Sequence, residues 1–133
     1  MRQTFLSAVT IMALAAPATA QQARFPDTPQ GRLAAGFFAA VGHSDERVLG
    51  QFQETNFSQA ALGRRSTEER LARNRQLRES AGALSLVSVV SEGDRELVVT
   101  ASGANAPGIT LMVTFTFTGG DAPKIDAVQI QAR

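Results

Sequence analysis

The sequence of 133 residues contains no cysteine, no tryptophan and no tyrosine, and it has one histidine and one lysine. The missing cysteine excludes disulfide bonds, a thiol nucleophile and thiolate metal sites. A single histidine without cysteine falls short of the three or four ligands that a zinc-type site takes. We therefore predict no metal ion and no cofactor, and we expect the fold to depend on packing alone.

An excess of charge of either sign is also missing. Thirteen Lys and Arg residues stand against twelve Asp and Glu residues, and one of the basic residues, Arg2, lies near the N-terminus. A balanced chain sets up no long-range field that would attract nucleic acid or an anionic membrane surface. We therefore expect no nucleic-acid partner.

The longest apolar run lies at the N-terminus, over residues 4–16, after a short positive start. It is followed by Ala18-Thr19-Ala20, which fits the small-x-small pattern of signal peptidase cleavage. The run is shorter than the roughly 20 residues that span a bilayer. We predict a signal peptide over 1–20, cleavage after Ala20, and a bacterial protein that is periplasmic or secreted, with no membrane insertion after removal of the signal.

The remaining residues predict one domain. Residues 21–27 are polar and are expected to form a flexible lead-in, and the domain itself is predicted over 28–131. Thr28 followed by Pro29 is typical of a helix start. Apolar residues then recur at helical spacing up to Gly42, where the first helix is predicted to end.

Two further helices are expected before residue 82. Ser44 predicts the cap of the second helix, and residues 57–62 predict a turn or a short helix after it. Ser66-Thr67-Glu68-Glu69 is a capping box, which opens a third helix running to about Ser80. That third helix has few large apolar residues, so we expect it to pack by a narrow edge.

From Gly82 onward the period of the apolar residues changes from 3.6 to 2, which indicates strands. We predict strands over 84–90, 96–101, 109–118 and 124–131. Three helices followed by a four-stranded antiparallel meander predict an α+β domain, with the helices packed on one face of a curved sheet.

A resemblance to a known family rests on four segments of the sequence. They are Thr28-Pro29-Gln30-Gly31-Arg32-Leu33, Phe37-Phe38-Ala39-Ala40, Ser44-Asp45 and Glu69-Arg70-Leu71-Ala72-Arg73. With them the chain resembles the nuclear transport factor 2-like fold, also called the SnoaL-like or cystatin-like α+β roll, over nearly all of 28–131. It is similar to the small domain that precedes serine beta-lactamase-type hydrolases and processing peptidases in exported bacterial proteins. We expect no hydrolase to follow this domain, and therefore expect any accessory role to act on a separate partner.

The resemblance implies a curved sheet rolled around a cone-shaped pocket. In some relatives this pocket binds a small apolar ligand or performs proton-transfer chemistry, and in others side chains fill it. We take five aromatic residues as its predicted lining, namely Phe37, Phe38, Phe52, Phe115 and Phe117.

Two residues are candidates for a general acid or base. His43 lies in a predicted turn, which favours a solvated side chain over a catalytic one. Asp126 shares a strand face with Val128 and Ile130 by the period of two, near the expected pocket mouth, where desolvation would raise its pKa. The alternative is an ordinary charge at a strand end. Relatives of the ketosteroid isomerase type also need a tyrosine in the oxyanion hole, which this chain lacks.

Six arginines gather between residues 64 and 78. At 100° per residue, Arg70 and Arg73 lie near one face of the third helix, and Arg75 and Arg78 lie on another. One interpretation is a solvated helix with surface ion pairs such as Glu69–Arg73. The other is a binding surface for an acidic partner or a carboxylate.

The third predicted strand has one threonine-rich face, formed by Thr110, Thr114, Thr116 and Thr118. A homodimer through this sheet face and an ordinary solvated face both fit that pattern.

Two functions from different classes fit the sequence. The first is an exported, non-catalytic small domain that binds a protein partner or a small apolar ligand. The alternative is a small pocket enzyme of the isomerase, cyclase or hydratase type, with Asp126, Glu54 or His43 as its base. An interior filled by phenylalanine would favour the first function.

Overall fold

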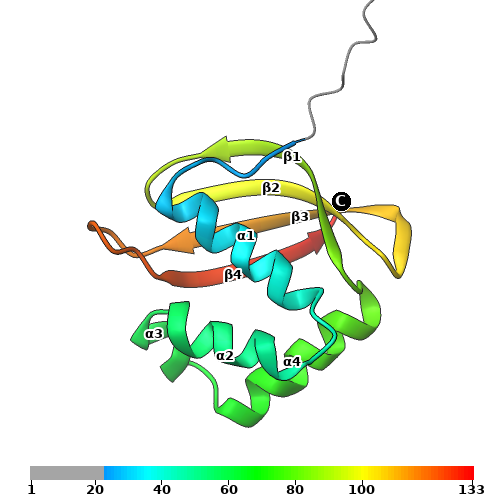
Figure 1. The fold of residues 1–133 in the computed structure, drawn as a ribbon, viewed down its shortest axis with the longest axis horizontal. Helices are drawn as coiled ribbons and strands as arrows, with labels where there is room; N and C mark the ends of the chain where they lie inside the picture. The colour runs from blue at the N-terminus through cyan, green and yellow to red at the C-terminus, as the bar shows by residue number, and fades with distance from the viewer. Residues whose placement is uncertain (1–22) are drawn as a thin grey trace, which may run out of the picture.

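The computed structural model describes residues 23–133 (Figure 1). Within them, four helices precede four strands: α1 (Pro29–Val41), α2 (Arg47–Asn56), α3 (Gln59–Gly63), α4 (Thr67–Ser80), β1 (Leu84–Glu92), β2 (Glu96–Gly103), β3 (Ala106–Phe117) and β4 (Ile125–Ala132). The strands form one antiparallel sheet in the order β1-β2-β3-β4. The predicted α+β class and meander are confirmed, with α3 as a short fourth helix. The predicted signal peptide and its cleavage site lie outside the described residues.

Side-chain caps define where the helices begin. The Thr28 hydroxyl oxygen accepts from the Gly31 N–H at 3.0 Å, and the Ser66 hydroxyl oxygen accepts from the Glu69 N–H at 3.2 Å. These two caps were predicted. The predicted cap at Ser44 is wrong, because α2 begins only at Arg47, after Glu46 at the cap position, and the Asp45 carboxylate accepts from the Arg47 N–H at 3.0 Å. Asp45 lies one residue closer to α2, and its charge makes the stronger hydrogen bond.

A glycine reverses the chain between α4 and the sheet. Gly82 has a φ of 73°, a left-handed conformation that glycine adopts without steric cost. A Cβ atom there would meet the Asn105 side chain at 2.9 Å. That side chain donates to the carbonyl oxygens of Arg78 and Glu79, both at 3.2 Å, and so satisfies the last turn of α4. These hydrogen bonds hold the end of α4 against the turn between β2 and β3.

Bulges interrupt the strand alternation at both edges of the sheet. In β1 the pairing with β2 shifts at Val87 and again at Val90, and both side chains are about half exposed. In β4 the pairing with β3 shifts at Asp126, which has no partner opposite it. Because a bulge adds one residue, Ile125 and Val128 both face the interior on either side of it.

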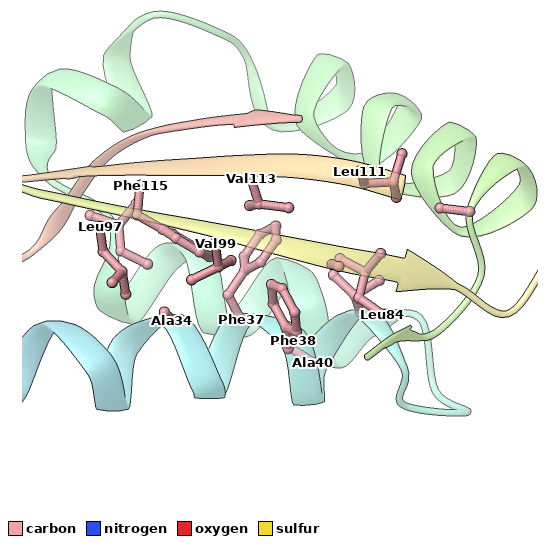
Figure 2. Close-up of a cluster of buried hydrophobic side chains, with 14 of the residues drawn as sticks. Ala34, Phe37, Phe38, Ala40, Leu84, Leu97, Val99, Leu111, Val113 and Phe115 are labelled. Carbon is pink, nitrogen blue, oxygen red and sulfur yellow. The ribbon is translucent and has the colours of Figure 1, made fainter. Parts of the chain in front are cut away.

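The core lies between α1 and one face of the sheet (Figure 2). Phe115 is fully buried at its centre, and its ring centroid is 5.7 Å from that of Phe37 and 6.2 Å from those of Phe38 and Phe117. Edge-to-face and offset rings at these separations are the favourable arrangements for aromatic pairs. The alternation predicted for 109–118 therefore builds the main hydrophobic contact with α1.

The segment before α1 also packs on the fold. The Phe25 ring meets the Phe38 ring edge-on at 5.0 Å. The Pro26 carbonyl lies so close to Gly31 that a Cβ atom there would overlap it. The packed structure thus begins at Phe25, inside the segment 21–27 that was expected as a lead-in.

Candidate functional site

A cavity of about 720 Å³ lies between α4 and the edge of the sheet formed by β3 and β4. Helix α4 turns Arg70, Arg73, Asn74 and Leu77 toward it, at the i, i+3, i+4, i+7 spacing of one helix face. Leu77 is the only large apolar side chain among these four. The helix therefore leaves space against the apolar sheet surface instead of filling it.

One end of the cavity is apolar. Leu77 from α4, Leu111 from β3 and Ile130 from β4 are part of its wall, together with Ile109, which is 47% exposed. Phe37 closes the cavity from the side of α1. A ligand that covers exposed and half-buried apolar side chains of this kind binds favourably, because it removes their apolar surface from water.

The other end is rich in arginine. Arg64, Arg65, Arg70 and Arg73 line it, and Asp126 is the one acidic residue among the described residues that do so. Cationic side chains in such excess favour an anionic ligand group.

Two of these arginines are engaged by the fold itself. Arg70 donates to the carbonyl oxygens of Leu62 and Arg65, both at 2.8 Å, and so closes the connection between α3 and α4. Arg64 donates to the Asp126 carbonyl at 2.6 Å and to its carboxylate at 3.3 Å. Within residues 23–133, the guanidinium groups of Arg65 and Arg73 have no hydrogen-bond or ion-pair partner. These two are the ones available to a ligand.

A buried amide pair lies between the polar and apolar parts of the cavity. The Gln53 amide nitrogen donates to the Asn74 amide oxygen at 2.9 Å, and the Asn74 amide nitrogen donates back to Gln53 at 2.8 Å. The residues are only 6% and 7% exposed. Each NH₂ group has a second N–H, which no described residue accepts. Because Gln53 and Asn74 both line the cavity, these second N–H groups are donors that an acceptor group of a ligand can use there.

Sequence reasoning missed this pair. Gln53 and Asn74 lie 21 residues apart on separate helices, and each looks like an ordinary surface residue in the sequence. The available signal was the position of Asn74 at i+4 from Arg70, on the face of α4 that also carries Leu77.

Asp126 lines the cavity at the bulge of β4. The Ser58 hydroxyl donates to its carboxylate at 2.7 Å, and Arg64 forms an ion pair with it at 3.3 Å. The Ser58 hydrogen bond, followed by the bond from Arg64, lowers the pKa of this carboxyl below its ordinary value. This direction is the opposite of the increase expected from desolvation. A lowered pKa makes Asp126 a weaker base.

Because of these contacts, Asp126→Asn is expected to reduce the free energy of unfolding at neutral pH by about 1 kcal/mol. The folded-state pKa lies below the value of about 3.9 for an unfolded aspartate. The stabilisation is therefore fully present above that value and is lost as the pH falls through the folded-state pKa. Urea denaturation from pH 7 to pH 2.5 checks this: the two proteins differ at pH 7 and converge in acid. A constant difference across the range would contradict it.

The other acid–base candidates lie away from the cavity. His43 is exposed in the turn between α1 and α2, where its Nδ1 accepts from the Asp45 N–H at 3.0 Å. Glu54 is exposed on α2 and is not part of the cavity wall.

Of the four arginines predicted on α4, Arg70 and Arg73 line the cavity, and Arg75 and Arg78 do not. Arg78 reaches the Ser44 carbonyl at 3.5 Å, and its Nη1 is buried without a partner among residues 23–133. The expected ion pair between Glu69 and Arg73 is absent from this part of the chain. This absence leaves Arg73 free.

The phenylalanines predicted as pocket lining divide into two groups. Phe37 borders the cavity, whereas Phe38, Phe115 and Phe117 are core residues packed between α1 and the sheet. Phe52 borders a second hollow of about 470 Å³, which is more open to solvent and lies beside residues 121–123. An apolar residue type does not by itself distinguish a core position from a cavity wall, so the pocket lining by all five rings stays a prediction.

The threonine face of β3 lies opposite the core. Thr114 and Thr116 are half-buried there, as is Thr118 just after the strand, and Thr110 is exposed. The homodimer through this face stays a prediction.

In the described part of the chain, no helix is long and apolar enough to cross a bilayer, and no group of three acidic or histidine side chains is arranged to hold a metal ion. Comparison of the chain with protein-family models, with curated proteins and with solved structures gives no match.

Proposed function

We propose that this chain is an exported, non-catalytic domain of the nuclear transport factor 2-like type, which binds a small amphipathic ligand in the cavity beside α4. The observation that carries the proposal is a cavity of about 720 Å³ with an apolar wall at one end and, at the other, arginines that have no partner among residues 23–133. Cavities of roughly 300–1,000 Å³ with apolar walls and a few polar groups are typical of small-molecule sites.

Both ends of such a ligand would contribute favourably to the free energy of binding. The apolar part would cover Leu77, Leu111 and Ile130, at about 0.8 kcal/mol for each buried methylene group. The anionic part would find Arg65 and Arg73, whose guanidinium groups present planar arrays of N–H donors. Neither interaction requires the fold to give up a hydrogen bond.

Binding is favoured over catalysis because, among the residues that the structure describes, none in the cavity wall is a suitable base. Asp126 is held ionised by Ser58 and Arg64, with a lowered pKa. A general base works best with a pKa near the operating pH, which this carboxylate does not have. His43 lies outside the cavity wall.

The proposal predicts saturable binding of 1-anilinonaphthalene-8-sulfonate, a fluorescent probe with an apolar aromatic body and one anionic group. Ile130→Trp places a large ring in the cavity and is expected to weaken this binding at least tenfold, because the ring occupies the apolar wall. Titration by fluorescence and by calorimetry measures the affinity and the stoichiometry.

The matched control is Val87→Trp, which adds the same ring at a half-exposed bulge of β1 away from the cavity. It should leave probe binding unchanged. Far-UV and near-UV circular dichroism excludes a loosened state, which also binds this dye. Absence of saturable binding to the folded protein, or equal weakening by both variants, would refute the proposed function.

A further inference from the structure

The polar groups at one end of the cavity and the apolar wall at the other define the class of ligand. We propose, resting on the function above, that the ligand is a monocarboxylate with an extended hydrocarbon chain. Its carboxylate lies against Arg73 and the Gln53–Asn74 amide pair, and its chain runs along Leu77 toward Leu111.

The head-group site follows from which donors the fold leaves unused. Arg73 and Asn74 both line the cavity from α4, so a guanidinium without a partner among the described residues and a buried amide with a spare N–H reach the same cavity. Gln53 supplies the second spare N–H. The unused hydrogen-bonding groups of Arg73, Gln53 and Asn74 described here are N–H donors, which suit an anionic head group better than a cationic one. A planar carboxylate accepts from such a set with both of its oxygens.

A single negative charge fits better than two. Arg64 is neutralised by its ion pair with Asp126, and Arg70 already donates to backbone carbonyls, so neither is set up to bind a second charge on the ligand. The Asp126 carboxylate lines the same end of the cavity and would repel a dianionic group such as a phosphate monoester.

The length of the wall sets the length of the chain. From Asn74 to Ala81, the cavity follows α4 for about 10 Å, at roughly 1.5 Å for each residue, which matches an extended chain of about eight carbons beyond the carboxylate. On the opposite side, Val128 and Ile130 of β4 line the same path. Beyond that length the chain would emerge at Ile109, which is half exposed.

The test is calorimetric titration of the folded protein with hexanoate, octanoate and decanoate, and with decanol, decylammonium and decyl phosphate. Affinity for the carboxylates should rise about fourfold for each added methylene, until the wall is covered. Decanol should bind at least tenfold more weakly than decanoate, and decylammonium more weakly still.

Two arginine variants separate the head-group contact from general charge. Arg73→Gln should weaken decanoate about tenfold and leave decanol unchanged, because it removes only the charged contact. Arg75→Gln removes the same charge from the other face of α4 and should leave both affinities unchanged.

The outcomes distinguish this inference from the function on which it rests. If neither the sulfonate dye nor any decyl compound binds, the proposed function fails. If decanol equals decanoate, if decyl phosphate or decylammonium binds more tightly, or if both arginine variants act alike, the cavity still binds ligands but the carboxylate assignment is overturned.

Discussion

Phe115→Ala is expected to lower the free energy of unfolding by about 3–5 kcal/mol. The Phe115 side chain is fully buried between α1 and the sheet, where three other rings contact it. Truncation removes its buried apolar surface and leaves a void that rigid neighbours fill only in part. Urea denaturation followed by circular dichroism measures the loss.

Phe52→Ala is the matched control for this change. Phe52 is half-buried and has one ring contact, with Phe37 at 6.3 Å, so its truncation should cost clearly less. Phe115→Ala should also leave ligand affinity of the remaining folded protein unchanged, because Phe115 is not part of the cavity wall. An equal loss of stability in both variants would contradict the central place of Phe115 in the core. Lost binding at Phe115→Ala would show that this ring is cavity lining after all.

The elements that depend on neighbouring residues were predictable from the sequence. The caps at Thr28 and Ser66, the change of period at Gly82 and the alternation from Leu111 to Phe117 all appear in the structure, whereas Ile109 is half exposed. Each rests on groups within a few residues, so local chemistry decides it. The Ser44 cap failed for the same reason, because the neighbouring Asp45 offers a stronger acceptor.

The cavity was not predictable in this way, because it depends on how α4 and the sheet meet. The helical spacing correctly separated Arg70 and Arg73 from Arg75 and Arg78, but the sequence does not state which face turns inward. The bulge at Asp126 and its contacts with Ser58 and Arg64 join residues more than 60 positions apart. These contacts reverse the expected direction of the Asp126 pKa shift.

The second large effect is expected at the buried amide pair. Asn74→Leu should lower the free energy of unfolding by about 2 kcal/mol, because it leaves the Gln53 amide buried without its partner. Replacing both residues by leucine should restore most of that stability, since two apolar side chains of similar size leave no unsatisfied group. Denaturation of the two single variants and the double variant gives the coupling energy. Losses that simply add would contradict the pairing.

The double variant also separates stability from function. If the amide pair is kept for folding, then restoring stability with two leucines should leave every ligand affinity intact. If it is the head-group site, then the double variant should fold well, bind decanol at least as tightly as the wild type, and lose the preference for decanoate. The second result is the expected one, because among described residues the spare N–H groups of Gln53 and Asn74 have no other acceptor. A stable double variant that keeps its preference for decanoate would assign the head-group contact to Arg65 and Arg73 alone.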